Sequence, residues 1–189
     1  TAPETTLSGS PPALTNASAS FGFSGDDGTG SGVAGFECKL DEAAFATCTN
    51  PANYNGLADG SHTFSVRAHD RAGNVEPEPA AVTWTVDAVA PTTSITAAPP
   101  ALSTSRAAEI SFTGSDTHAV HFECSLDGAA FTACSSPASY NGLADGTHSF
   151  QVRAIDAVGN TDATPATTAW QIDATAPPTP VITSAPADP

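Results

Sequence analysis

An internal repeat constrains the fold of this 189-residue sequence more than any other feature. Residues 36–75 recur as residues 122–161, at an offset of 86 residues, with 26 of the 40 positions identical. Fixed-period similarity is the signature of a tandem array, in which each repeat is one structural unit. We therefore expect one repeat at residues 1–88, a second at residues 89–175, and the first strand of a following repeat at residues 176–189. The chain contains no Met, so we expect a mature form or an excerpt, and the partial third repeat favours a window cut from a longer array.

Hydrophobic periodicity predicts that each repeat is all-β. Apolar residues alternate with small or polar ones at Phe21 and Phe23, and again at Val82, Trp84 and Val86, a period of two that is typical of half-buried strands. Turn signals such as Asp-Gly recur every 8 to 12 residues, a spacing that favours a sandwich. The expected fold is two tandem immunoglobulin-like β-sandwiches, with Trp84 and its counterpart Trp170 in the cores.

Charge and hydropathy exclude several classes of protein. There are 20 acidic and 5 basic side chains, a net charge of −15, and this acidity argues against a nucleic-acid partner. No apolar run approaches the ~18 residues of a membrane-spanning helix, so no membrane insertion is expected.

The four cysteines predict two disulfides. Of the three ways to pair them, the repeat favours Cys38–Cys48 with Cys124–Cys134, which gives each repeat an equivalent bridge of its own. Each bridge would join two arms of one hairpin, stabilise the fold by roughly 2.5–3 kcal/mol, and require an oxidising compartment. Buried free thiols are an alternative, whereas zinc is disfavoured because the close thiolate spacings it needs do not occur.

The stretch 57–74 and the joints around Pro91 and Pro177 resemble fibronectin type III and bacterial immunoglobulin-like tandem repeats. In that family, such repeats imply β-sandwich rods in secreted or surface-anchored proteins, including adhesins, fibres and the spacers of secreted enzymes. Related repeats in large bacterial adhesins use calcium at the seams between repeats. Because the cysteines lie close in sequence, the long-range disulfide of antibody domains is not carried over.

The resemblance makes the carboxylates near the repeat ends candidates for calcium ligands, since calcium takes six to eight oxygen ligands. The alternative is that these residues only stabilise turns through local hydrogen bonds. Asp26 and Asp27 have a weaker claim, because unit two matches them only with Asp116. The candidate ligands are Asp87, Asp173, Asp70, Asn74, Asp156 and Asn160.

Other polar and aromatic residues have structural interpretations. We expect His62 and His148 to pack at a strand edge, and Arg67 and Arg153 to pair with nearby acids. Tyr54 and Tyr140 resemble a structural tyrosine of sandwich corners, with a sugar-stacking platform as the alternative. His118 and His121 occur only in the second repeat and are a weak metal signal. The Asn16-Ala-Ser18 sequence matches a glycosylation sequon.

Catalysis has little support, because the strongest candidate residues occur in both repeats and duplication fits structural demands better than an active site. We expect a non-enzymatic, extracellular rod or fibre of a surface adhesin or filament. Its partners would be adjacent repeats or neighbouring copies, joined by strand addition at the last segment. The alternative is a spacer or carbohydrate-binding module of a secreted hydrolase. No cofactor is expected other than calcium at the repeat junctions.

Overall fold

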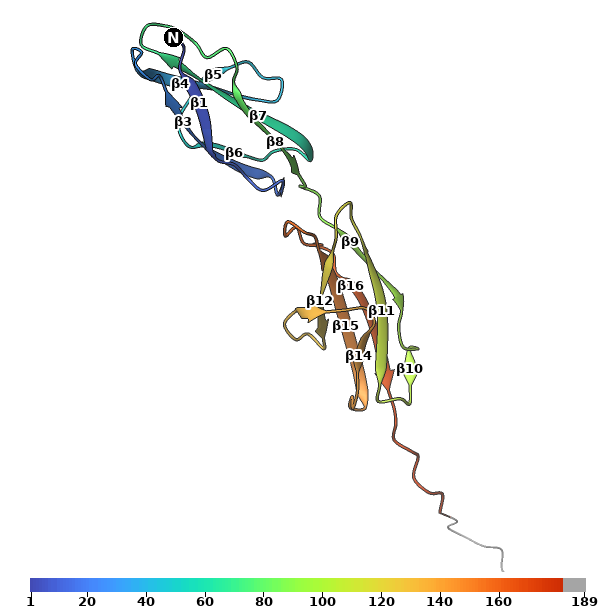
Figure 1. Ribbon diagram of the computed structural model, residues 1–189. Coiled ribbons are helices and arrows are strands. Elements are labelled where there is room, and N and C mark those ends of the chain that lie inside the picture. The colour runs from blue at the N-terminus through green and yellow to red at the C-terminus, as the bar shows by residue number, and fades with distance from the viewer. Residues whose placement is uncertain (182–189) are drawn as a thin grey trace, which may run out of the picture. The chain divides into compact units, whose positions relative to one another are not determined.

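The computed structural model describes residues 1–181 and shows two compact units, the first containing strands β1 to β8 and the second β9 to β16 (Figure 1). Residues 1–181 contain strands, turns and bends only, so none of them belongs to a helix that could cross a membrane. The prediction of an all-β chain with two sandwiches is confirmed.

Eight strands build the first unit as two facing sheets. Three of them form a sheet in the order β1-β3-β6, and the other five form a sheet in the order β2-β8-β7-β4-β5. All neighbours are antiparallel except β2 and β8, which run parallel over two residue pairs. The strands are β1 (Glu4–Gly9), β2 (Leu14–Thr15), β3 (Ser18–Asp26), β4 (Val33–Leu40), β5 (Ala46–Cys48), β6 (Ala52–Asn55), β7 (Gly60–Asp70) and β8 (Ala80–Val86).

The second unit repeats this topology. Its sheets have the orders β14-β11-β9 and β10-β16-β15-β12-β13, again with one parallel pair, β10 with β16. Its strands are β9 (Thr92–Ala97), β10 (Leu102–Ser103), β11 (Ala108–Ser115), β12 (His121–Leu126), β13 (Thr132–Cys134), β14 (Ala138–Tyr140), β15 (Gly146–Ile155) and β16 (Ala166–Ile172).

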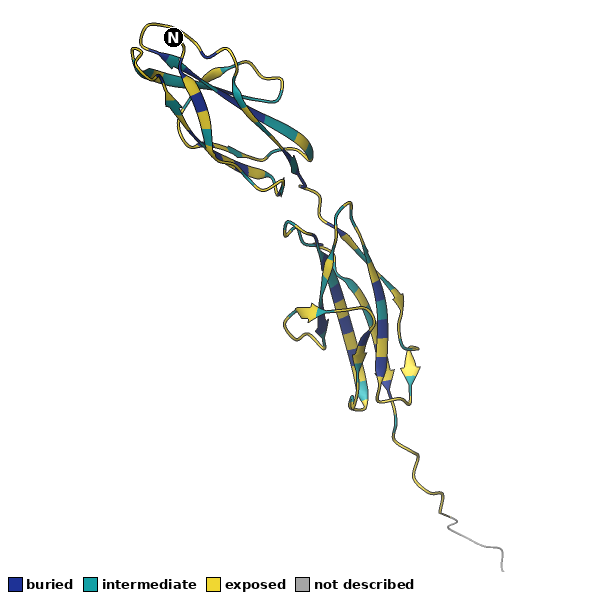
Figure 2. Cartoon of the chain, in the orientation of Figure 1, coloured by how far each residue is buried: buried dark blue, intermediate teal, exposed yellow. Residues whose placement is uncertain are grey.

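The core of each unit lies between its two sheets, where the inward residues of the alternating strands meet (Figure 2). In the first unit Phe21 of β3 and Phe64 of β7 are fully buried and stack with ring centroids 4.1 Å apart. Trp84 and Trp170 are 3% and 2% exposed, which confirms their assignment to the cores. The stacked pair of Phe21 and Phe64 stabilises the fold by roughly 0.5–1.5 kcal/mol beyond the contribution of the surface that it buries.

Within the first unit, the chain enters at one end of the sandwich and leaves at the other. Glu4, at the start of β1, lies opposite Asp26 at the end of β3, whereas Val86, at the end of β8, lies beside Thr15, just before β3 begins. The nine residues of β3 span roughly 25–30 Å at ~3.3 Å per residue. The two ends of the unit's chain are therefore separated by about the length of a strand.

The strand of a further repeat, expected at residues 176–189, is not seen in the described part of that segment. Residues 176–181 have no strand or bridge, and Val181 is 80% exposed. The rest of that segment, residues 182–189, lies outside the described residues.

Candidate functional site

The two predicted disulfides are present and link a strand pair in each unit. Cys38 of β4 is bonded to Cys48 of β5 with their Cα atoms 5.7 Å apart, and Cys124 is bonded to Cys134 at 5.8 Å. The cysteines are diagonal rather than opposite, since Cys38 pairs in register with Ala46. Asp41, in the turn between β4 and β5, adopts a left-handed conformation with φ of 53°, which returns the chain to this register.

Of the predicted calcium ligands, Asp70 and Asn74 are brought together by hydrogen bonds within their own turn. Oδ1 of Asp70 accepts the N–H groups of Ala72 at 2.9 Å and Asn74 at 2.8 Å, and Oδ2 accepts from Nδ2 of Asn74 at 2.7 Å. The bond from the Asn74 side chain is the main cause that lowers the pKa of Asp70 below its ordinary value. This carboxylate is already satisfied by local donors, which is the turn interpretation of these residues.

Asp156 directly follows β15, and Asn160 lies in the turn between β15 and β16. These positions correspond to Asp70 and Asn74 in the first unit, so the repeat places an aspartate and an asparagine in the same turn twice. Whether either turn binds calcium stays a prediction.

Asp87 and Asp173 each follow the last strand of a unit and make matching backbone contacts. The N–H of Asp87 donates to the carbonyl of Thr15 at 2.8 Å, and the N–H of Asp173 donates to that of Ser103 at 2.9 Å. Oδ1 of each accepts a backbone N–H two residues later at 3.3 Å. Both aspartates therefore extend the parallel strand pairing by one residue, and their role as calcium ligands stays a prediction.

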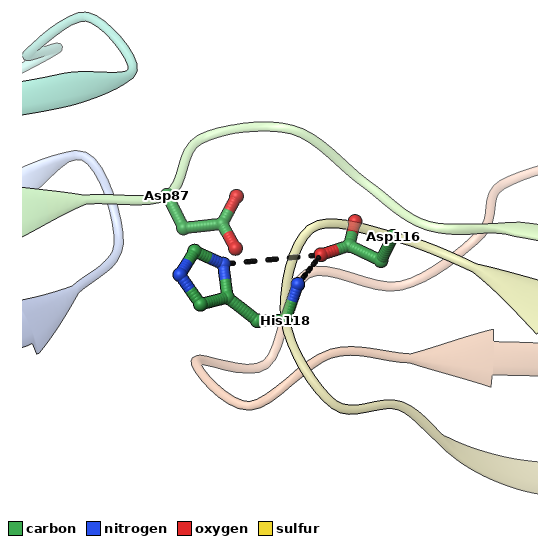
Figure 3. Close-up of side chains that lie close together, drawn as sticks. All are labelled: Asp87, Asp116 and His118. Carbon is green, nitrogen blue, oxygen red and sulfur yellow. Dashed lines mark hydrogen bonds and ion pairs between the residues drawn. The ribbon is translucent and has the colours of Figure 1, made fainter.

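In the second unit, Asp116 and His118 meet in the loop between β11 and β12 (Figure 3). Oδ1 of Asp116 accepts the N–H of His118 at 2.8 Å and lies 3.9 Å from Nδ1 of its ring. The weak metal signal of His118 and His121 stays a prediction, and within this loop the ring of His118 lies beside the aspartate two residues earlier.

A histidine–aspartate pair fixes the start of the longest strand in each unit, and the sequence analysis missed it. Nδ1 of His62 lies 2.8 Å from Oδ2 of Asp41, and Nε2 lies 2.9 Å from the carbonyl of Ala58. Only the imidazolium form can donate to both acceptors, and these bonds, first the one to Ala58, raise the pKa of His62. His148 makes the same contacts with Asp127 and Ala144, also at 2.8 and 2.9 Å.

The aspartate of the pair also binds backbone. Oδ1 of Asp41 accepts the N–H of Thr63 at 2.8 Å. Burial raises the pKa of Asp41, but the bonds from Thr63 and His62 outweigh that effect and hold the pKa below its ordinary value. His62 is the third residue of β7, which is the central strand of its sheet.

An arginine on the outer face of each five-stranded sheet pairs with an acid, as predicted. Nη2 of Arg67 lies 2.7 Å from Oε2 of Glu37, and its guanidinium carbon lies 4.1 Å from the centroid of the Phe45 ring. The second unit repeats the set with Arg153, Glu123 and Phe131, at 2.6 and 4.3 Å. The guanidinium of each arginine covers one face of its phenylalanine ring, which leaves less of the ring free for a sugar to stack on.

A buried carboxylate joins the two sheets of the first unit. Glu76 is 5% exposed, and its Oε1 accepts the N–H of Thr5 on β1 at 2.8 Å. Its Oε2 accepts the hydroxyl of the same threonine and, at 3.0 Å, the N–H of Ala68 on β7. Because β1 and β7 belong to different sheets, one side chain links both layers of the sandwich.

The second unit makes this link with a shorter acid. Asp162 is 4% exposed and is bonded to Thr93 of β9, and the hydroxyl of Thr93 accepts the N–H of Ala154 on β15 at 2.8 Å. Burial raises the pKa of Asp162, but the hydrogen bonds that this carboxylate accepts lower the pKa by more. The bond from Thr93 has the largest lowering effect, and the pKa lies below its ordinary value.

The repeated tyrosines are packed on the core. The Tyr54 ring, on β6, meets the rings of Phe21 and Phe64 edge-on at 6.0 and 5.9 Å, and Tyr140 meets Phe150 in the same way at 6.1 Å. Burial raises the pKa of both tyrosines. Among residues 1–181, the large hydrophobic side chains that are exposed are three valines and Leu102, with no aromatic residue among them.

No protein-family model matches this sequence, and no curated protein matches it. Several solved structures match over most of the chain. Fibronectin(III)-like modules of Clostridium thermocellum CbhA are 18% identical with a TM-score of 0.49, over 89% of this chain and 94% of theirs. A Ca²⁺-stabilised adhesin with which an Antarctic bacterium binds ice is 20% identical with a TM-score of 0.48, over 89% of this chain and 48% of that one. A 1.5-MDa bacterial ice-binding adhesin is 13% identical with a TM-score of 0.47, over 89% of this chain and 64% of that one. The chain is thus similar, at low identity, to fibronectin type III-like modules and to bacterial adhesins.

Proposed function

We propose that this chain is a structural, non-catalytic part of an extracellular tandem array, and that the array forms a rod or fibre in a surface adhesin or filament. The observation that carries the proposal is the path of the chain through the first unit, which enters opposite Asp26 and leaves beside Thr15. A unit whose chain ends lie at opposite ends of its strands adds roughly 25–30 Å, the length of β3, each time it is repeated.

The duplication of the polar contacts supports a structural role. The disulfide, the histidine–aspartate pair, the arginine on phenylalanine and the acid that links the two sheets all occur once in each unit. Each of these contacts holds parts of one sandwich together. Stability of each unit by itself is what a repeat in an array requires, because neighbouring repeats contribute only at their shared boundaries.

The two disulfides support an extracellular setting, because such bonds persist in oxidising compartments. The acidity, 20 acidic against 5 basic residues, would keep neighbouring arrays apart in solution. The partners we propose are adjacent repeats of the same array or neighbouring copies of it, with calcium as the cation that stiffens the junctions.

Small-angle scattering of the chain and of head-to-tail duplications of it tests the proposal. The expected result is a maximum dimension that increases by a constant amount for each added unit. A maximum dimension that stays nearly constant as units are added would refute the rod, because it would mean that the units fold back on one another.

The alternative is a carbohydrate-binding or spacer module of a secreted hydrolase. A glycan array and a pull-down on insoluble polysaccharides decide between the two functions. We expect no binding, because the described residues offer no exposed aromatic ring. Saturable binding of one sugar class would favour the alternative.

A further inference from the structure

A buried carboxylate oxygen in the first unit has no partner within the described residues. Asp27, which follows β3, is 9% exposed, and its Oδ2 accepts the N–H of Gly32 at 2.7 Å. Its Oδ1 is buried and accepts no hydrogen bond. No ion pair involving Asp27 is found among residues 1–181 either. A buried charge left without compensation is costly, so this oxygen calls for a ligand that supplies positive charge or a donor.

The loop that surrounds Asp27 is built to approach its carboxylate closely. A Cβ atom on Gly30 would lie 2.1 Å from Oδ2 and 2.4 Å from Oδ1, so only a glycine fits there. The N–H of Gly30 donates to the carbonyl of Asp27 at 2.8 Å, which folds the loop back over the side chain. No turn or side-chain hydrogen bond among residues 1–181 uses the carbonyl oxygens of Gly28 and Thr29, which therefore remain available as ligands.

Two further carboxylates lie at this end of the first unit, and the guanidinium of the exposed Arg71 lies beside Gly32 of the loop. Asp26 is exposed beside the same loop, and its Oδ1 accepts the N–H of Gly28 at 2.8 Å. Glu4 of β1 lies directly opposite Asp26 in the strand register. Like charges at opposite register positions are destabilising unless something neutralises them. A bound cation would satisfy the buried oxygen of Asp27 and reduce this repulsion at the same time.

We propose that the loop between β3 and β4 of the first unit binds a calcium ion, with Oδ1 of Asp27 as the buried ligand and the Asp26 carboxylate and loop carbonyls as the others. All of these ligand atoms are oxygens, which calcium prefers, and a loop rich in glycine can bring several of them around one ion. The site lies within one loop, and it stands or falls separately from the role proposed for the array.

The second unit lacks this loop and provides an internal comparison. Asp116 occupies the position of Asp27, but the five residues Gly28 to Gly32 are replaced by Thr117 and His118 alone. Oδ1 of Asp116 accepts the N–H of His118 at 2.8 Å, and within the described residues neither oxygen of Asp116 is a buried atom without a partner. We therefore expect this type of loop site only in the first unit.

Two-dimensional amide NMR of the ¹⁵N-labelled chain, stripped of metal by a chelator and then titrated with calcium chloride at constant ionic strength, tests the site. The amide signals of Gly28, Gly30 and Gly32 should shift and saturate, with a midpoint of about 0.1–1 mM, as for other extracellular calcium modules. Asp27→Asn should weaken binding by about tenfold or more, since it removes the buried charge. Glu42→Gln, which neutralises an exposed acid of the same unit outside the loop, should leave the midpoint unchanged.

Three results would overturn the proposal. One is the absence of saturable shifts in these glycines up to about 10 mM calcium, far above the expected range, which would leave a water molecule as the partner of Asp27. The second is an unchanged midpoint in Asp27→Asn, and the third is an equal response to magnesium. If Asp27→Asn does not fold, the exposed Asp26→Asn replaces it and should also raise the midpoint.

Discussion

Removal of the Glu76 side chain should weaken the first unit more than any surface substitution. In Glu76→Ala the N–H groups of Thr5 and Ala68 lose their acceptor while both residues remain in the interior, at 7% and 0% exposure. Each buried donor left without a partner costs about 1–3 kcal/mol, so the two amides together give an expected loss of roughly 2–6 kcal/mol in the free energy of unfolding. A unit of this size loses about 4–8 °C of melting temperature per kcal/mol, which corresponds to a fall of at least about 8 °C.

Differential scanning calorimetry of the whole chain measures this effect. The control is Glu78→Ala, which removes an exposed acid from the same segment and should shift the melting temperature by less than about 3 °C, the effect of an ordinary surface change. Asp162→Ala should lower the transition of the second unit and spare the first. If Glu76→Ala and Glu78→Ala melt within about 3 °C of each other, the carboxylate does not join the sheets in the way described.

The remaining predictions concern the other contacts that the two units share. The pKa of His62 is raised above its ordinary value of 6.5. Protonated His62 therefore makes its whole contribution to stability below pH 6.5, and this contribution is lost as the pH rises through the raised pKa of the folded state. The Asp41 pKa is lowered below 3.8, so its stability is present above that pH and is lost as the pH falls through the lowered pKa. Urea unfolding should therefore show the first unit more stable at pH 5 than at pH 8, by under about 1 kcal/mol because the Asp41 side chain is 41% exposed and water screens the pair. His62→Ala should abolish the difference, and an unchanged difference would exclude His62 as its origin. Replacing Cys38 and Cys48 together by alanine should cost the first unit roughly 2.5–3 kcal/mol by urea unfolding, with no change in the second, whereas a loss shared by both units would contradict their independence. Arg67→Ala should lower the free energy of unfolding of the first unit by about 0.5–1 kcal/mol at this half-exposed site. Arg67→Lys should recover only part of that loss, since lysine has no planar guanidinium to stack on Phe45, and full recovery by lysine would mean that charge alone matters.

The sequence predicted the features that depend on local pattern. The alternation through Phe21, Phe23, Trp84 and Val86 located two strands and their buried faces, because strand side chains alternate with a period of two. The repeat indicated the disulfide pairing, since one pairing gives each unit an equivalent bridge of its own. These inferences needed no knowledge of how distant strands meet.

The contacts that the sequence missed join residues far apart in the chain. Glu76 binds Thr5 across 71 residues, and nothing in either local sequence marks them as partners. His62 meets Asp41 because β4 pairs with β7 in a register that puts Leu40 opposite Phe64, which a strand pattern does not specify. The buried oxygen of Asp27 could be recognised only once the loop was seen to close over it.

The short parallel pairing of β2 with β8 has a mechanical consequence. β8 leads out of the first unit at one end, while β2 is tied through β1 to the point where the chain enters at the other end. A pull on both ends of the unit would slide these two strands past each other in opposite directions, along their length. The hydrogen bonds between them, from Thr85 to Ala13 at 2.9 Å and from Asp87 to Thr15 at 2.8 Å, lie across that direction and would have to break together. Their shear strength, rather than the strength of any one bond, would then set the force at which the unit begins to unravel.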